Sequence, residues 1–411
     1  MRMCRRGLVL VMIALALTAL LQLSKQAWTT QLPEPAWVAQ LPEQTWTASP
    51  SEPEECTGGS FYTVYDQADP NTVVFQTGMG VAVGDQYQTE DDRLYEVISV
   101  DEGQRTAIAR FLEQVQLSAD TLAFIENLMT SAPKAGKGQV TVGVYHTHSS
   151  ESYVPSDGTD SIRGNGGIFK VGAALVESLK EAGARVVYSD SRHDPHDSAA
   201  YTRSRRTAQQ LLRQGSTALL DVHRDAGGGP QSYSTTVDGR NVSQIRLVVG
   251  RQNPNMSTNK QFAQEIKAAT DKQVPGLIKG IFFARGGYNQ DLSGRNLLLE
   301  VGTDTSSRED AAAGASLFAK VYANYLGART SAAQAGQNRE SGAGSRAALW
   351  MVGLVIVGAS AWLLLSTGGW NEASSKLRTF VTKEFSNALG TARRPKHRQK
   401  GPGDDEGDRN R

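Results

Sequence analysis

The stretch VTVGVYHTHSSESY, residues 140–153, decides the fold of this chain. Its first six residues, VTVGVY, are β-branched, aromatic or small, which is the composition of a buried strand. His146, His148 and, three residues later, Glu151 follow this run. Imidazole nitrogens and carboxylate oxygens are zinc ligands, and a loop at a strand end lets such side chains turn to one point. The stretch therefore predicts a strand that delivers the first ligands of a metal site.

Two other strand-like runs also end in residues that can bind a metal or move a proton. Residues 217–223 (TALLDVH) end in His223, and residues 296–300 (NLLLE) end in Glu300. Because α/β proteins gather their sites at the carboxyl ends of strands, we expect these side chains close to the first stretch. We therefore predict a zinc site with three ligands and a general base for the attacking water: His148, Glu151 and His223 as ligands, and Glu300 as the base.

The neighbours of these ligands have roles that the sequence leaves open. Strand alternation turns His146 to the same side as His148, so it is a candidate ligand, a residue that orients a ligand, or a substrate contact. Arg224 and Asp225 directly follow His223 and are candidates for substrate contact or for support of the ligands. A single histidine or arginine at a strand end is usually structural. It is the coincidence of three strand ends that favours a metal.

The segment 137–327 alternates strand-like and helix-like patterns. Helical spacing marks residues 169–182, 201–214, 257–270 and 308–326, and strand-like runs lie between them at 184–189, 243–250 and 280–284. Such alternation is typical of an α/β fold with helices on both faces of the sheet. We predict an open mixed sheet flanked by helices over this segment.

The segment 57–136 has a different pattern, with short alternating runs at 61–65 and 93–100 separated by glycine-containing turns. It predicts a small β-rich domain in front of the α/β domain. Apolar residues at helical spacing over 105–131 predict helices that lead into the catalytic unit, with a hinge at 133–137.

Apolar runs near both ends of the chain predict membrane helices. Residues 1–24 carry three arginines before an apolar run with no clear small-x-small cleavage site, which favours an uncleaved anchor over a secretory signal. Residues 347–367 contain about twenty uncharged residues and precede a basic tail, 368–411. The positive-inside rule puts both ends in the cytoplasm and the region between them outside. Two segments of small and polar residues are predicted linkers: 25–56 and 328–346.

Composition excludes several classes of function. The formal net charge of +1 gives no general reason to expect a nucleic-acid partner. The two cysteines, Cys4 and Cys56, lie outside the α/β segment, so neither a disulfide framework nor a cysteine metal site is expected. Without a nucleophile elbow or a cysteine in that segment, a serine or cysteine hydrolase is disfavoured.

Three motifs resemble the signature segments of stage II sporulation protein P, a family of membrane-anchored peptidoglycan hydrolases of spore-forming Firmicutes. They are YHTHSSESY at 145–153, LLDVHRDA at 219–226 and GRNLLLEVG at 294–302. Their order and spacing match, and the resemblance extends over roughly 60–327. It implies a zinc amidase-like fold with the same assignments: His148, Glu151 and His223 on zinc, Glu300 as the catalytic glutamate, and His146 without a defined role. The second membrane span and the basic tail depart from the expected pattern.

The resemblance also implies an activity and a setting. A zinc-dependent N-acetylmuramoyl-L-alanine amidase cleaves the amide between N-acetylmuramic acid and the stem peptide, and endopeptidase activity on cross-links is attributed to the same family. Implied partners are peptidoglycan, the membrane, and stage II sporulation proteins D and M during engulfment. The expected location is the cell membrane, with the hydrolase domain outside the cytoplasm at the forespore septum or intermembrane space.

The residues alone leave two alternatives. A zinc carboxypeptidase or endopeptidase that trims stem peptides would use the same ligand pattern. A non-catalytic scaffold that binds peptidoglycan or sporulation partners would keep the fold with a degenerate metal site. The complete set of ligands argues against the scaffold, and a variant lacking Glu300 separates it from an enzyme.

Overall fold

A computed structural model describes residues 55–56, 59–130, 140–229 and 231–327. These residues all belong to one compact unit of the chain. The predicted membrane helices at 1–24 and 347–367 lie outside the described residues. Within the described part, no helix combines the length and apolar character that a membrane span requires.

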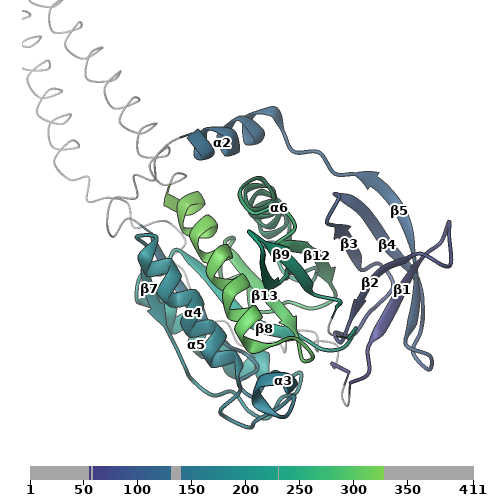
Figure 1. Ribbon diagram of the computed structural model, residues 1–411, viewed down its shortest axis with the longest axis horizontal. Coiled ribbons are helices and arrows are strands. Elements are labelled where there is room, and N and C mark those ends of the chain that lie inside the picture. Colours follow the sequence, from purple (N-terminus) through teal and green to yellow (C-terminus); the bar gives the residue numbers. More distant parts are fainter. Residues whose placement is uncertain (1–54, 57–58, 131–139, 230, 328–411) are drawn as a thin grey trace, which may run out of the picture. The chain divides into compact units, whose positions relative to one another are not determined.

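One large mixed sheet forms the centre of the fold (Figure 1). It has eleven strands in the order β2-β1-β5-β4-β3-β12-β11-β13-β8-β6-β7. A parallel block at one end carries the motif segments: β7 (Arg185–Tyr188), β6 (Thr141–Tyr145), β8 (Ala218–Asp225) and β13 (Asn296–Thr303). Next come β11 (Ile245–Gly250), antiparallel to β13, and β12 (Ile278–Ala284), parallel to β11. The predicted mixed α/β architecture is confirmed.

Helices cover both faces of the α/β part of the sheet, because alternate strand residues are apolar on each side. Val144 and Leu220 pack on one side with α4 (Ile168–Glu181), α6 (Met256–Gln273) and the helix at 308–327. Their neighbours Tyr145 and Leu219 point to the other side, where they meet α5 (Ala200–Arg213). Shorter elements complete this part: α3 (Val154–Asp157), the 3-10 helix η1 (Gln290–Leu292), and a separate hairpin of β9 (Ser234–Val237) and β10 (Arg240–Ser243).

The β-rich segment continues the same sheet. It contributes β1 (Tyr62–Asp66), β2 (Val73–Thr77), β3 (Gln86–Thr89), β4 (Arg93–Asp101) and β5 (Thr106–Gln114). Strand β3 pairs with β12, with Tyr87 opposite Phe282, and one apolar cluster joins Phe75 and Tyr87 to Val248 and Phe282. The two parts that the sequence separates therefore share hydrogen bonds and a core. The predicted boundary at 136/137 and the predicted hinge at 133–137 both fall within residues 131–139, which lie outside the described residues.

The helix predicted over the first half of 105–131 is wrong. Residues Thr106–Gln114 form β5, which pairs with β4 and β1, and a helix begins only at α2 (Ala119–Thr130). The apolar residues that suggested helical spacing are largely outside the core: Ile108 is 42% exposed and Phe111 is 45% exposed. Ala107 and Ala109 are the buried residues instead. Pairing with two distant strands overrides the local pattern.

Candidate metal centre

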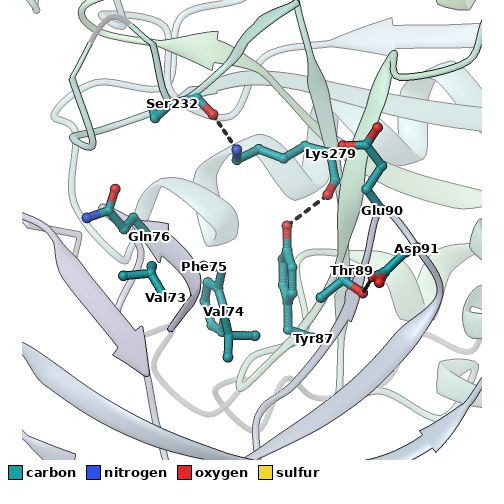
Figure 2. Close-up of a pocket in the computed structure, with 10 residues that line it drawn as sticks. All are labelled: Val73, Val74, Phe75, Gln76, Tyr87, Thr89, Glu90, Asp91, Ser232 and Lys279. Carbon is teal, nitrogen blue, oxygen red and sulfur yellow. Dashed lines mark hydrogen bonds between the residues drawn. The ribbon is translucent and has the colours of Figure 1, made fainter. Parts of the chain in front are cut away.

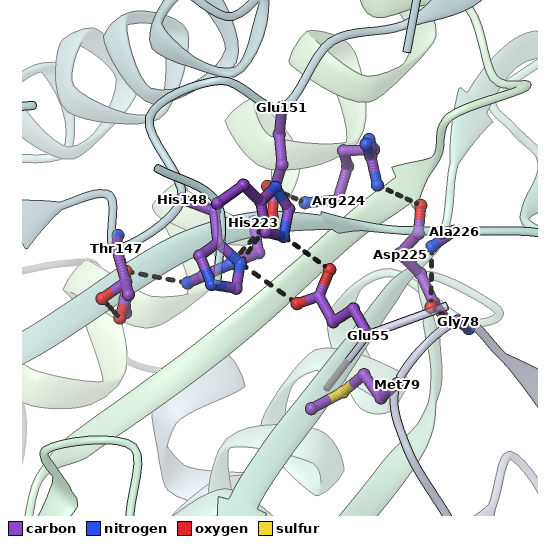
Figure 3. Close-up of polar contacts among 12 residues, drawn as sticks. Glu55, Gly78, Met79, Thr147, His148, Glu151, His223, Arg224, Asp225 and Ala226 are labelled. Atoms are coloured by element: carbon purple, nitrogen blue, oxygen red, sulfur yellow. Dashed lines mark hydrogen bonds and ion pairs between the residues drawn. The ribbon is translucent and has the colours of Figure 1, made fainter. Parts of the chain in front are cut away.

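Strand ends of the parallel block bring the predicted ligands together. His148 lies three residues beyond the end of β6, Glu151 belongs to the loop that follows, and His223 lies near the end of the adjacent β8 (Figure 3). All three side chains are buried. The loop returns to the start of α4, where the Ile168 amide donates to the Glu151 carbonyl at 3.1 Å.

The donor atoms of the two histidines lie close to one oxygen of the third predicted ligand, Glu151. Glu151 Oε1 lies 3.1 Å from His148 Nδ1 and 3.1 Å from His223 Nδ1. Four zinc ligands at the usual bond lengths stand about 3.3–3.6 Å from one another in a tetrahedron. The observed separations are only a few tenths of an ångström shorter, and the donors are the nitrogen and oxygen atoms that zinc accepts. The residues present therefore fit a metal ion.

A fourth group that sequence reasoning missed stands at the same point. Glu55 places Oε1 3.0 Å from His148 Nδ1 and Oε2 2.9 Å from His196 Nε2 (Figure 3 shows Glu55 facing His148). One ligand atom from each of Glu55, His148, Glu151 and His223 lies within 4.8 Å of every other. The predicted linker offers no signal for this residue, because a glutamate in a polar segment is unremarkable.

The charged groups of this cluster shift one another's pKa values. Burial alone would lower the pKa of His148, but the carboxylates of Glu55 and Glu151 outweigh it and raise that pKa to about 9. For Glu55, burial raises the pKa, yet the positive charges of His148 and His196 hold it well below its usual range. His223, between Asp221 and Glu151, also has a raised pKa despite its burial. Without a metal, protons on the histidines balance the carboxylates.

Asp221 is a second residue that the sequence prediction missed. Its Oδ1 lies 3.0 Å from His223 Nε2, the nitrogen that faces away from the ligand cluster. Thr147 holds this carboxylate through its backbone amide at 2.8 Å and its hydroxyl at 2.5 Å. A carboxylate behind a metal-binding histidine fixes the ring and strengthens the ligand. A signal was present, since Asp221 interrupts the otherwise apolar run TALLDVH.

Glu300 is placed beside the cluster by strand register. It is the partner of His223 across the β8–β13 pair, so both side chains stand on the same face of the sheet. Its Oε2 is buried and has no hydrogen-bond partner among the described residues. Burial, reinforced by the negative charge of Asp225, raises the pKa of Glu300 well above its usual value. A carboxylate whose pKa is raised in this way takes up a proton more readily than an ordinary one, which is the property of a general base.

Arg224 supports the loop that carries Glu151. Its backbone amide donates to Glu151 Oε2 at 2.8 Å. Its guanidinium donates to the carbonyls of Ser152 at 3.1 Å and Asp160 at 2.9 Å. The same loop leaves no room for a side chain at Gly166, where a Cβ would stand 2.2 Å from the Glu151 carbonyl oxygen. Arg224 thus orients a ligand through the backbone.

Asp225 belongs to a separate buried cluster on the same face. Its carboxylate forms an ion pair with Arg246 and accepts hydrogen bonds from the Tyr233 hydroxyl at 2.8 Å, the Thr77 hydroxyl at 3.0 Å and the Gly78 amide at 2.8 Å. Both oxygens are occupied. Asp225 therefore ties β2 of the β-rich segment to the strand that carries His223.

His146 points away from the ligand cluster. Its Nδ1 lies 2.8 Å from the Val222 carbonyl and its Nε2 lies 3.2 Å from the Tyr188 hydroxyl. The ring packs against α4, where a Cβ on Gly172 would stand 2.4 Å from it. Burial lowers its pKa to about 4, so the ring is neutral. Both nitrogens are engaged in the core, and neither faces the other ligands.

A hollow of about 700 Å³ lies between β2, β3 and Lys279 (Figure 2). The stacked rings of Phe75 and Tyr87 line it, with centroids 4.3 Å apart, and Lys279 reaches across it to donate to the Ser232 carbonyl. Burial lowers the pKa of Lys279 to about 8. Three strand spacings separate β8 from β12, which carries Lys279, so this lysine lies about 14 Å from the ligand strand. An extended peptide of about four residues could span this distance.

A known family matches most of the described region of the chain. The family model described as Stage II sporulation protein P matches residues 82–323. A curated relative, Stage II sporulation protein P of Bacillus subtilis (strain 168), is 28% identical over 245 residues, which cover 54% of this chain and 59% of the relative. The match thus spans less than two thirds of that relative's length.

Solved structures with a similar arrangement include amidases. The N-acetylmuramyl-L-alanine amidase Ami1 from Mycobacterium smegmatis matches with a TM-score of 0.32 and 14% identity, over 46% of this chain and 98% of that one. The N-acetylmuramoyl-L-alanine amidase AmiC2 of Nostoc punctiforme matches with a TM-score of 0.30 and 16% identity, over 46% and 99%. Similarity at this level carries no conclusion about the reaction.

Proposed function

The chain belongs to the stage II sporulation protein P family, and from this premise we propose that it is a zinc-dependent peptidoglycan hydrolase. The bond it cleaves is the amide between N-acetylmuramic acid and the stem peptide. One observation carries the proposal. The Nδ1 atoms of His148 and His223 both lie 3.1 Å from Glu151 Oε1, and the buried Glu300 stands next to His223.

Zinc held by His148, Glu151 and His223 would polarise the scissile carbonyl and lower the pKa of a water molecule towards neutrality. Asp221 and Thr147 keep the His223 ring in place, and Arg224 keeps Glu151 in place. Glu300 takes the proton of the attacking water and returns it to the leaving amine. Its raised pKa suits both steps, because the group must accept and then release a proton at one pH.

The proposed setting follows from the predicted topology and the family. Anchors at 1–24 and 347–367 would hold the hydrolase region outside the cytoplasm, against the peptidoglycan of the forespore septum. Stage II sporulation proteins D and M are the proposed partners during engulfment. A peptide bound at the metal centre could extend to the hollow beside Lys279.

The test is a digest of purified peptidoglycan by the 411-residue chain, with zinc and with a chelator, followed by mass analysis of the products. We expect free stem peptides only in the zinc sample. A Glu300→Gln variant should lose activity by about 10²–10⁴-fold while it still binds zinc. A matched control, Glu102→Gln, removes an exposed carboxylate from the turn after β4 and should keep full activity.

Two other results would contradict the amidase. Shortened or uncrosslinked peptides that remain on glycan would identify a peptidase of the same metal class. Full biological function of the Glu300→Gln variant in engulfment would identify a scaffold, since a binding protein does not need a general base.

A further inference from the structure

Glu55 is the ligand-cluster residue whose role the proposed reaction does not explain. Two protein carboxylates and two imidazoles meet at one point, although the proposed chemistry uses only His148, Glu151 and His223 as ligands. Glu55 is 18% exposed, and each of its oxygens contacts a histidine. The contacts of Glu55 with His148 and His196 are therefore mostly buried and have a defined geometry.

The number of ligands separates two kinds of zinc site. Catalytic sites have three protein ligands and an open position for water or substrate, whereas sites with four protein ligands are closed. Glu55 Oε1 lies 3.0 Å from His148 Nδ1, close to the 3.1 Å that separates Glu151 from the same nitrogen. It stands where a fourth ligand would stand. With Glu55 in this position, no ligand position is left for a substrate carbonyl.

We propose that Glu55 is a fourth metal ligand that closes the centre, so that this structure is a self-blocked form of the chain. The inference rests on the proposed function, since it concerns access to the same zinc. Hydrolysis then requires that the Glu55 carboxylate leave the metal.

His196 secures the blocking carboxylate. Its Nε2 lies 2.9 Å from Glu55 Oε2, and its ring stacks on the His148 ring with centroids 3.8 Å apart and planes 25° apart. His196 thus touches both the blocking group and a ligand but supplies no atom to the metal cluster. His196 therefore holds the Glu55 carboxylate in place and is not itself assigned as a ligand.

The attachment of Glu55 differs from that of the other ligands. His148 and His223 follow or lie within strands of the central sheet, whereas Glu55 precedes the first strand, in the predicted linker at 25–56. Among the described residues, the backbone hydrogen bond next to Glu55 is that from the Cys56 amide to the Gly78 carbonyl, at 2.7 Å. Movement of the Glu55 side chain away from the metal breaks its contacts with His148 and His196 and no strand pairing of the sheet.

The experiment compares the 411-residue chain with Glu55→Gln, with Glu102→Gln as the matched control. Each is loaded with Co²⁺ in place of zinc, and its visible spectrum is recorded with and without acetohydroxamate, a chelating anion that needs an open position. The spectra of the parent chain and the control should change little. The spectrum of Glu55→Gln should change when acetohydroxamate is added, and the change should saturate as the acetohydroxamate concentration rises.

Two further readouts fix the role of Glu55. Zinc affinity, measured by chelator competition, should fall at least about tenfold in Glu55→Gln, because a ligand is lost. Release of stem peptides from peptidoglycan should rise at least about tenfold in the same variant. His196→Ala should shift activity in the same direction by a smaller factor, which provides a test if Glu55→Gln folds poorly.

Three outcomes would overturn the proposal. Equal binding of acetohydroxamate by parent and variant, with equal zinc affinity, would show an open site and leave the proposed hydrolase standing. Loss of peptide release in Glu55→Gln would place Glu55 in the catalytic machinery. A parent chain that binds neither zinc nor Co²⁺ would remove both this inference and the zinc enzyme.

Discussion

Two buried charge clusters stand on one face of the sheet, and they differ in what balances their charge. In the Asp225 cluster the chain supplies its own cation, Arg246, and every carboxylate oxygen has a donor. In the candidate metal centre, the donor atoms of His148, Glu151 and His223 meet at one point, and protons on the histidines help to balance the carboxylates when no metal is bound.

The two clusters are linked by register, since His223 pairs with Glu300 and Glu300 pairs with Arg246 across neighbouring strands. Two clusters that are both buried and both contain carboxylates thus differ in how they can respond to an added cation. A cluster that contains its own cation is a fixed part of the fold. A cluster whose nitrogen and oxygen donors converge on one point can bind an external cation in exchange for its protons.

The largest effect should come from removing the internal cation. Arg246→Met leaves Asp225 buried without its ion-pair partner and should cost about 3–5 kcal/mol of unfolding free energy. Chemical denaturation measures the loss, and adding Asp225→Asn to the same chain should recover part of it. A change below about 1 kcal/mol would mean that the Asp225–Arg246 pair does not stabilise the fold.

The metal centre should instead respond to pH. In the metal-free chain His148 carries a proton below a pKa of about 9, and zinc must displace that proton. Zinc affinity should therefore rise at least about tenfold per pH unit from pH 6 towards 9 and level off above it. Chelator competition across this range measures the slope. A zinc affinity that does not change with pH would contradict the claim that zinc displaces a proton from His148.

Lys279 tests whether the neighbouring hollow contributes to substrate binding. Lys279→Met removes the ammonium but keeps the length of the side chain, and it should raise KM for peptidoglycan about 3–10-fold, the effect of roughly one lost polar contact. Zinc affinity should stay the same, because the lysine lies about 14 Å from the ligand strand. An unchanged KM would exclude the hollow from the substrate path.

The smallest effect on metal binding should come from His146. His146→Asn keeps a donor close to the Val222 carbonyl but loses the Tyr188 contact, so stability should fall by about 0.5–1.5 kcal/mol. Zinc affinity should not change. A clear loss of zinc affinity without a loss of stability would make His146 a ligand, which the sequence left open.

The parallel block could be predicted because its signals are local. Runs such as TALLDVH and NLLLE are apolar enough to mark β8 and β13 without any knowledge of their neighbours. The assignment at β5 failed for the opposite reason. Its helical spacing is also local, but pairing with β1 and β4 decides its structure. The β3–β12 pairing joins residues about 190 positions apart, and no local pattern reports it.

The same distinction applies to the metal centre. The convergence of His148, Glu151 and His223 was predictable because they follow or end recognisable strands. Asp221 was detectable as a charge inside a buried run. Glu55 and its partner His196 were not detectable, because polar residues in irregular segments look like solvent-exposed ones until the folded chain brings them together.

The most direct test of a zinc centre is metal analysis of the purified 411-residue chain. After dialysis against zinc-free buffer, the chain should retain about one zinc ion per molecule, as should His146→Asn. His223→Ala should retain little, since it loses a ligand from β8. A parent chain without zinc, or a His223→Ala variant that holds as much zinc as the parent, would contradict the account.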